Sequence, residues 1–477
     1  MREKYRLSII SIAILLFSCN IVSCQCITNN EDISFSNNEE IIKLAVVGDI
    51  LATKNIQETA ARSINNSIDD PYLRVASGFE SLFDQKVIEL LSSADITFGN
   101  LETPIAEGLT EKWYYDDTGR PVSEEVEIDP GILYDNNVYK YNPMMIMNAH
   151  PALAIALKNI GFDVVSTANN HYANRASNGI DKTIDALREA ELDFVGTIRY
   201  DELIDENNDG FPDNKAYIIK EVKGVKIAFL AYVCHVNHIN GGFQWQPFFC
   251  NGLLPADEYC SRQTYCSLSN NSKVEFNVRS FCNCIGNAKE EADIVAVSLH
   301  AGFWLRHNPS LLQKAYIKRF IESGADIIIG HGPHVLQPIE IVETEDNRKV
   351  CIFNSLGNFI CDGGTENRGL VNNFLSVIGY VNIIKNDDII SVHNYSYTPI
   401  FSLKNNKNTK VVVADNSYKK SFEIIDIIIN GNDFQRYLLS ELYLLKVPGG
   451  KILIRDDMLP ERYITIKWFF ENLLRNK

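Results

Sequence analysis

The sequence lacks an excess of basic residues, any C-x-x-C cysteine pair and, beyond its N-terminus, any long apolar run. Its 477 residues include 45 Lys+Arg and 61 Asp+Glu, a formal net charge of −16. A chain this acidic is not expected to bind nucleic acid, because contact with phosphates needs a basic surface. A membrane-spanning helix needs roughly 18 apolar residues, and no later run approaches this length. With 45% hydrophobic and 22% charged residues, the composition is that of a globular protein in water.

Residues 1–24 are predicted to be an export leader. Three basic residues among the first six precede an apolar stretch over 7–17, which is too short to span a bilayer comfortably. Cys19 and Cys24 each follow a serine, as at the end of a bacterial lipoprotein leader, so either is a candidate for lipid attachment. An uncleaved anchor or an ordinary signal peptide is the alternative. Residues 25–40 are polar and are expected to form a tether, which predicts an exported, membrane-anchored lipoprotein of the cell envelope, in the periplasm or on the outer face.

Six of the eleven cysteines lie in one segment, 234–284. In an oxidising compartment this crowding predicts an insertion stapled by disulfides, whose pairing the sequence does not distinguish. A zinc site and free thiols are the alternatives. The six residues are Cys234, Cys250, Cys260, Cys266, Cys282 and Cys284.

From residue 41, short apolar runs alternate with amphipathic stretches, which is typical of an α/β protein. The apolar runs are rich in β-branched residues, as expected for strands covered on both faces. Strands are expected at 43–48, 95–99, 163–167, 225–232, 293–300, 325–330 and 350–354, and helices at 79–93, 151–160, 177–190, 285–291 and 309–323. We predict one domain over 41–400, interrupted by the Cys-rich insertion 234–284, and an accessory segment over 401–477.

Polar side chains follow five of the predicted strands. The strand ends are Gly48-Asp49, Asn100-Leu101-Glu102, Asn169-Asn170-His171, His300-Ala301-Gly302, and Gly330-His331 running on to His334. Because ligands of α/β sheets bind at the carboxyl ends of strands, these side chains are expected to meet. Carboxylates, amide oxygens and neutral imidazoles suit a divalent ion such as Mn, Zn or Fe. The pattern therefore predicts a metal-dependent hydrolase, in which a histidine protonates the leaving group.

The order and spacing of these motifs resemble the bacterial capsule-synthesis CapA family, also called the poly-γ-glutamate biosynthesis family, within the calcineurin-like metallophosphoesterase superfamily. The motifs are those above with Thr103-Pro104 after Glu102, the run Gly330-His331-Gly332-Pro333-His334-Val335-Leu336-Gln337-Pro338, and Ser355-Leu356-Gly357-Asn358-Phe359. The likeness extends from about residue 43 to 400, with 234–284 as an insertion. It implies a four-layer α/β/β/α metallophosphatase-like sandwich and a role in assembling an envelope polymer.

The resemblance also implies roles for single residues. His171 would be catalytic, as a proton donor or phosphate contact, and Asn100 and Asn358 would contact the substrate. The alternative for each residue is a cap or a hydrogen-bonded core group, which is the commoner fate of a lone polar residue at a strand end. The implied ligands of one or two metal ions are Asp49, Glu102, Asn170, His300, His331 and His334.

Three features depart from the family pattern. Ile50 follows Asp49, so the Asp-x-His opening of typical superfamily phosphatases is missing. Trp304 stands where many relatives have Glu, and Gly332 stands where many have a second His. These departures favour one full metal site over two.

The acidic segment 205–213 resembles the start of an EF-hand calcium loop. Its oxygen-bearing residues have the spacing of such ligands, with Gly210 at the sharp turn. Ala216 replaces the glutamate that would close the loop, and a solvated acidic turn explains the same residues. The candidate calcium ligands are Asp205, Asn207, Asp209 and Asp213.

Two functions of different classes fit the sequence. The first is an exported metal-dependent hydrolase of the CapA type, which cleaves a phosphoester or amide bond of a capsule polymer of the poly-γ-glutamate type. The second is a non-catalytic subunit that binds an anionic polymer or its synthase components on the same scaffold. An ordinary secreted phosphatase is a third, weaker alternative.

Overall fold

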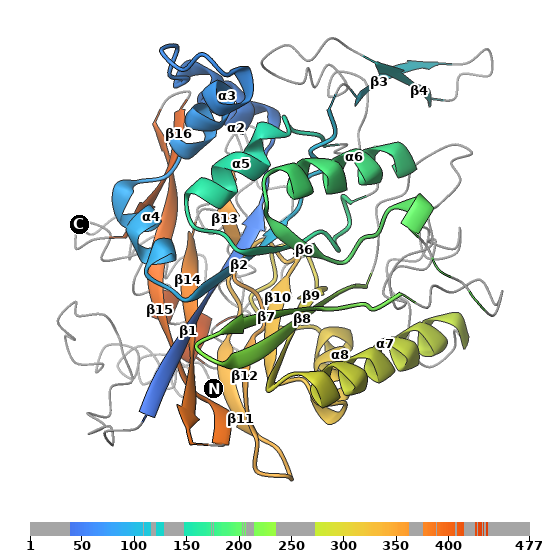
Figure 1. Cartoon of the computed structure of the whole chain (residues 1–477), viewed down its shortest axis with the longest axis vertical. Coiled ribbons are helices and arrows are strands. Elements are labelled where there is room, and N and C mark those ends of the chain that lie inside the picture. Colours follow the sequence, from blue (N-terminus) through green and yellow to red (C-terminus); the bar gives the residue numbers. More distant parts are fainter. Residues whose placement is uncertain are drawn as a thin grey trace, which may run out of the picture.

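The computed structural model describes residues 39–436, with gaps, and arranges them as two β-sheets with flanking helices (Figure 1). The residues outside this description are 1–38, 108, 116–120, 128–146, 173, 175, 203, 205, 207–213, 235–271, 362–374, 388, 406–407, 415–424, 427, 432, 434–435 and 437–477. The predicted leader and nearly all of the predicted tether lie outside the described residues and stay predictions.

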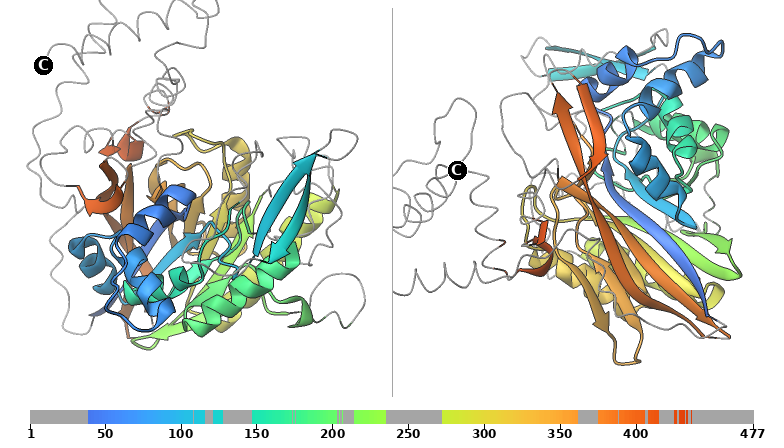
Figure 2. Two further views of the ribbon diagram at one scale, coloured as in Figure 1. Left: turned by 90° about the horizontal axis from the view of Figure 1, so that it is seen from above. Right: turned by 90° about the vertical axis from the view of Figure 1, so that its left-hand side faces the viewer.

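Within the described residues, the first sheet has eight strands. They are β1 (Glu39–Ile50), β2 (Ile96–Leu101), β5 (Val164–Ser166), β6 (Asp193–Val195), β13 (Asn358–Ile360), β14 (Leu375–Asn386), β15 (Ile389–Asn405) and β16 (Asn408–Val413). The order is β16-β15-β14-β1-β2-β5-β6, and β13 also pairs with β1. β1 is parallel to β2 and antiparallel to β14, and Figure 2 shows the long strands β14 and β15 beside it.

The second sheet has six strands within the described residues. In spatial order they are β11 (Ile339–Glu343), β12 (Lys349–Phe353), β10 (Ile327–His331), β9 (Ile294–His300), β8 (Val225–Val233) and β7 (Ile218–Val222). The four central strands are parallel, so the carboxyl ends of β9 and β10 lie at the same edge. A separate hairpin pairs β3 (Leu109–Tyr115) with β4 (Pro121–Glu127).

The helices lie on the outer faces of the two sheets, α5 and α6 on one side of the molecule and α7 and α8 on the other (Figure 1). The described helices are α2 (Lys54–Arg62), α3 (Pro71–Glu80), α4 (Gln85–Ser92), α5 (Ala152–Asn159), α6 (Ala176–Glu189), α7 (Ser272–Glu291) and α8 (Leu311–Glu322), with a 3-10 turn η2 (Tyr200–Glu202). None of them combines the length and apolar character that crossing a membrane requires.

Three buried cores define four layers. Between the sheets, Phe98 of β2 stacks on Phe229 of β8, with ring centroids 5.4 Å apart. Val46 of β1 belongs to this inner core, whereas its neighbour Val47 packs under α3 and α5, because successive side chains of a strand point to opposite faces. Phe320 of α8 belongs to the third core, outside the second sheet. This arrangement is the predicted α/β/β/α sandwich.

The prediction of a single helix over 79–93 is wrong, because α3 ends and α4 begins within that stretch. α3 ends at Glu80, and the chain then forms an isolated β-bridge between Phe83 and Val411. Asp84 starts the second helix, since its side chain accepts a hydrogen bond from the Lys86 N–H at 3.1 Å. The break therefore comes from a partner more than 300 residues away, which local periodicity does not reveal.

The domain boundary predicted at residue 400 is also wrong. β15 crosses that position, and its last residues pair with β16. Farther on, Ile428 is buried in the core between the sheets. Arg436 donates a 2.9 Å hydrogen bond to Asn308 Oδ1 and is itself buried. The described part of 401–477 thus completes the fold.

The predicted disulfide-stapled insertion is not supported. No disulfide links the five cysteines that the structure describes, Cys234, Cys282, Cys284, Cys351 and Cys361. Cys282 and Cys284 both lie on α7, so the end of the predicted insertion is helical, and residues two apart do not share a helix face. Cys250, Cys260 and Cys266 lie outside the described residues.

Candidate metal centre

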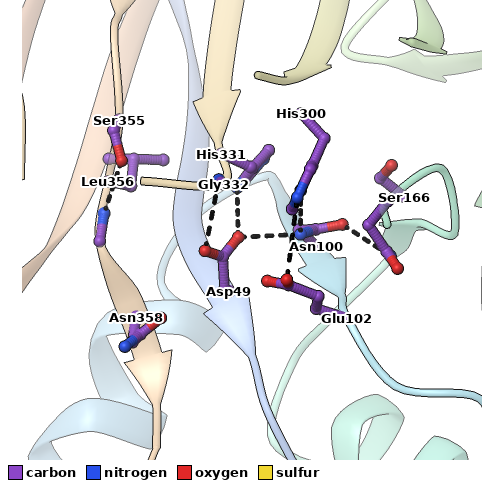
Figure 3. A network of polar contacts seen from close by, with 12 residues as sticks. Asp49, Asn100, Glu102, Ser166, His300, His331, Gly332, Ser355, Leu356 and Asn358 are labelled. Atoms are coloured by element: carbon purple, nitrogen blue, oxygen red, sulfur yellow. Dashed lines mark hydrogen bonds and ion pairs between the residues drawn. The ribbon is translucent and has the colours of Figure 1, made fainter. Parts of the chain in front are cut away.

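The site forms where strand ends from both sheets meet (Figure 3). Asp49 lies at the end of β1, and Glu102 directly follows β2 of the same sheet. His300 ends β9 and His331 ends β10 of the second sheet, where they are paired neighbours. Apart from His334, which is 15% exposed, these side chains are almost completely buried. The predicted meeting of the strand-end residues is therefore found.

Close backbone approach brings Asp49 into this position. The Asp49 N–H donates to the Gly357 carbonyl at 2.9 Å, next to the parallel pairing of Asp49 with Asn358. A Cβ atom on Gly48 would lie only 2.0 Å from the Gly357 oxygen. Only glycine fits at residue 48, because any side chain would force the strands apart.

The Asp49 carboxylate is surrounded by nitrogen atoms. Its Oδ1 accepts a 2.8 Å hydrogen bond from Asn100 Nδ2 and lies 3.3 Å from His331 Nδ1. Its Oδ2 lies 3.0 Å from His334 Nδ1. Burial alone would raise the pKa of Asp49, but the adjacent imidazoles of His331 and His334 outweigh it and hold that pKa well below its usual value. Asp49 is therefore the ionised acid of the site.

Glu102 differs sharply from Asp49. Its Oε1 lies 3.7 Å from His300 Nε2 and 3.6 Å from His334 Nε2, and both of its carboxylate oxygens are buried with no hydrogen-bond partner. Burial, followed by the nearby negative charge of Asp49, raises the pKa of Glu102 well above its usual value. A buried acid without partners costs free energy, so this position needs a functional reason.

The donor set fits a divalent cation. Asp49, Glu102 and His300 each offer a ligand atom, and these atoms lie within 4.8 Å of one another. His331 Nε2 is also buried without a hydrogen-bond partner. A cation among these groups would satisfy the unpaired oxygens of Glu102 and offset its repulsion with Asp49. Mixed carboxylate and imidazole ligands suit Mn, Zn or Fe.

His334 reaches the site from a strained loop. Its φ of +58° lies in the left-handed region, which is costly for a residue other than glycine. Besides Asp49, its Nδ1 lies 2.9 Å from Asn358 Oδ1, so an oxygen flanks this nitrogen on each side. Nδ1 therefore carries the hydrogen, and Nε2, near Glu102, keeps the lone pair that a metal needs.

Asn169 is a site residue that the sequence-based assignment missed, although it directly precedes the predicted ligand Asn170. Its Nδ2 donates to Asn100 Oδ1 at 3.2 Å and to the Leu101 carbonyl at 2.8 Å. Its Oδ1 accepts from the His171 N–H at 3.1 Å. Asn169 thus links the loop that carries His171 to the carboxylate and histidine cluster. The signal that could have identified it was the Asn-Asn-His motif itself.

Several assignments stay predictions. Asn170 is half-buried, and its role as a ligand is untested. Asn100 and Asn358 contact Asp49 and His334, which explains both residues without a substrate. Trp304 is 54% exposed, whereas the cluster is buried. The candidate calcium ligands Asp205, Asn207, Asp209 and Asp213 lie outside the described residues.

Fold and site together define a class of protein: a two-sheet α/β sandwich with a buried carboxylate and histidine cluster at the meeting strand ends. Residues 43–122 and 131–363 match the family described as bacterial capsule synthesis protein PGA_cap. The chain belongs to this family, which confirms the resemblance noted in its motifs.

Two relatives come from Bacillus. The capsule biosynthesis protein CapA of Bacillus anthracis is 28% identical over 325 residues, which are 68% of this chain and 61% of that protein. The PGA biosynthesis protein CapA of Bacillus subtilis (strain 168) is 25% identical over 327 residues, 68% of this chain and 65% of that protein. The match thus spans less than two thirds of the length of either relative.

Solved structures overlap only weakly. A hypothetical protein from Thermus thermophilus has a TM-score of 0.36 at 12% identity and covers 75% of this chain and 98% of its own. A novel phosphatase from Mycoplasma pneumoniae has a TM-score of 0.35 at 13% identity, with coverages of 80% and 97%. Overlap at this level carries no argument about function.

Proposed function

We propose that the chain is a metal-dependent hydrolase that acts on a phosphoester or amide bond of an envelope polymer during capsule synthesis. The observation that carries the proposal is Glu102, whose buried carboxylate has no hydrogen-bond partner and lies beside Asp49, His300 and His334. Natural proteins rarely keep such a group unless it binds something. Membership of a capsule-synthesis family supports the process, and the names of the Bacillus relatives support a polymer of the poly-γ-glutamate type.

The residues would divide the work as follows. Asp49, Glu102 and His300 would hold a divalent ion, with His331, His334 and Asn170 as further ligands. When bound, such an ion supplies Lewis-acid activation of water and of the attacked phosphoryl or acyl group. Asn100 orients Asp49 through its 2.8 Å hydrogen bond, and Asn358 orients His334.

His171 would complete the hydrolysis. Water adds to the phosphorus or carbonyl carbon and loses a proton, and the bond to the leaving oxygen or nitrogen breaks. His171, protonated on both ring nitrogens, gives the leaving atom a proton, and the proton lost by the water restores the protonated ring. His171 is 5% exposed, so bulk water does not compete freely for this proton. Asn169 ties the His171 backbone to the loop beside Glu102, which keeps the donor close to the cluster.

A non-catalytic binding subunit is the second candidate. Trp304, where many relatives have Glu, is 54% exposed and adds no carboxylate to the cluster. Such a subunit would hold an anionic polymer or synthase components on the same scaffold. In either case we propose an exported protein, anchored to the membrane by lipid on Cys19 or Cys24.

Metal content tests the proposal first. The full chain and three variants would be incubated with Mn²⁺, Zn²⁺ or Fe²⁺, desalted and examined by elemental analysis. We expect the wild-type chain to retain metal, and Asp49→Asn and Glu102→Gln to lose it. Glu291→Gln is the matched control, because Glu291 is an exposed acid paired with Lys215. If the wild-type chain retains no metal, the proposal of a metal-dependent hydrolase is refuted.

Hydrolysis is then measured on phosphoester and γ-glutamyl amide substrates. His171→Gln should keep the metal and lose roughly 10²-fold or more in rate, as expected for removal of a general acid. A wild-type chain that holds metal but cleaves neither bond would favour the binding subunit.

A further inference from the structure

Asn174 is a buried residue that contacts the imidazole of His171. It is 2% exposed, and its Oδ1 lies 2.7 Å from His171 Nδ1. Its own N–H donates to the His171 carbonyl at 2.9 Å, so a tight turn holds the two residues together. The motif that pointed to His171 ends before Asn174, and nothing in the sequence singled it out.

The orientation of the Asn174 amide follows from a third residue. The backbone N–H of Met147 donates to the same Oδ1 at 2.9 Å. A backbone N–H can only donate, so the atom between Met147 and His171 must be the amide oxygen. That oxygen can only accept, and therefore His171 Nδ1 must carry a hydrogen. Nε2 of the neutral ring is then the nitrogen with the free lone pair.

The backbone of His171 is held by a second residue, Asn169. Its N–H donates to Asn169 Oδ1, and Asn169 is joined through Asn100 to Asp49 of the metal cluster. Two independent contacts therefore hold this residue, one to the main chain and one to the ring. Because Nδ1 donates to Asn174, Nε2 is the ring nitrogen that can exchange a proton with a substrate.

We propose that Asn174 is a positioning residue, which keeps a hydrogen on Nδ1 of His171, so that Nε2 is the nitrogen that takes up a proton and donates it to the leaving atom. The inference rests on the proposed function, in which His171 is the proton donor. Because an amide is neutral, Asn174 selects the tautomer without placing a second negative charge near Asp49 and Glu102. Free imidazole in water favours the other tautomer, so loss of Asn174 should release His171 to it.

Nuclear magnetic resonance tests the tautomer directly in the metal-free full chain labelled with ¹⁵N-histidine. Spectra recorded about two pH units above the ordinary histidine pKa of about 6.5 report the neutral ring. His171→Gln assigns the signal by its disappearance. We expect a protonated, pyrrole-type Nδ1 and an unprotonated, pyridine-type Nε2 in the wild type. The reverse pattern would overturn the proposal without any variant of Asn174.

Three variants separate positioning from a merely structural role. Asn174→Asp keeps the accepting oxygen and should keep the Nδ1–H tautomer, whereas Asn174→Leu should shift the signal toward the Nε2–H form. Asn148→Leu is the matched control, because Asn148 is a buried asparagine next to Met147 whose side chain bonds Ala106 rather than His171. An unchanged tautomer in Asn174→Leu, or an equal shift in Asn148→Leu, would overturn the proposal.

Kinetics provide the second measurement if the metal-loaded chain hydrolyses a substrate. Asn174→Leu should lower kcat by roughly 10²-fold with KM nearly unchanged, and Asn174→Asp should restore most of kcat. Metal content should be equal in the wild type, Asn174→Leu and Asn174→Asp. The tautomer is measured without metal or substrate, so an inactive wild type would refute the proposed function and leave the spectra as a separate test of Asn174.

Discussion

Replacing Glu102 by Gln should stabilise the metal-free protein, whereas with metal the variant should be less stable than the wild type. In the metal-free protein, both Glu102 oxygens are buried without partners, and burial together with the nearby charge of Asp49 disfavours the ionised form that Glu102 has in the unfolded chain. The amide is the same size, carries no charge and can donate to Asp49. We therefore expect Glu102→Gln to stabilise the metal-free protein.

The magnitude follows from the two opposing effects. Relief of a buried unsatisfied polar group contributes roughly 1–3 kcal/mol in favour of the variant. A ligand that binds only the folded state stabilises it by about 4 kcal/mol when its concentration is about 1,000-fold above Kd. Only the wild type gains this stabilisation, so with metal it should be the more stable protein by about 1–3 kcal/mol.

Urea unfolding with a chelator and with saturating metal provides the assay. The midpoints of both proteins are compared in each condition, and unchanged slopes show that stability alone has altered. Glu291→Gln serves as the control, with an expected change within about 0.5 kcal/mol in both conditions, because Glu291 belongs to an exposed pair.

Destabilisation of the metal-free protein by Glu102→Gln would contradict this expectation, because Glu102 would then have a structural partner. An equal gain in stability of both proteins from metal would also contradict it, because Glu102 would then not be a ligand. A stabilised variant that no longer binds metal would show that this position gives up stability for function.

Two further predictions concern a buried histidine and a strand contact. Burial lowers the pKa of His307 to about 4, against about 6.5 unfolded, so the unfolded chain binds the extra proton first as pH falls. The contribution of His307 to stability should be intact above pH about 6.5 and fall by about 2 kcal/mol by pH about 5; urea midpoints against pH should show a shallower decline in His307→Gln, and an equal decline would contradict the assignment. Gly48→Ala places a Cβ atom 2.0 Å from the Gly357 oxygen, and we expect a loss of about 3 kcal/mol with weakened metal binding, measured by urea unfolding and elemental analysis. Unchanged stability and metal content in Gly48→Ala would show that β1 and the Gly357 turn separate at little cost.

Much of the fold was predictable from local sequence. The apolar run that contains Val46 and Val47 is buried on both faces of β1, and the other expected strands correspond to β2, β5, β8, β9, β10 and β12. Parallel strands place their carboxyl ends at one edge, so the polar residues after them were expected to converge, and Asp49, Glu102 and His300 do.

Other features depended on distant contacts that periodicity does not record. Asp84 separates α3 from α4 next to a bridge with Val411, and β15 continues past the predicted domain boundary because β14 and β16 pair along it. The crowding of six cysteines over 234–284 predicted disulfides, yet Cys282 and Cys284 lie on α7 and form none.

The sequence by itself determined which residues carry the chemistry, because the strand-end motifs and their order are local properties of the chain. Only the tertiary structure decided what each residue does there. Asp49 and Glu102 are both carboxylates, yet Asp49 has nitrogen donors on both oxygens and Glu102 has none. That difference arises where two sheets meet, and it gives the two acids opposite pKa shifts because charge stability depends on burial and partners rather than on residue type.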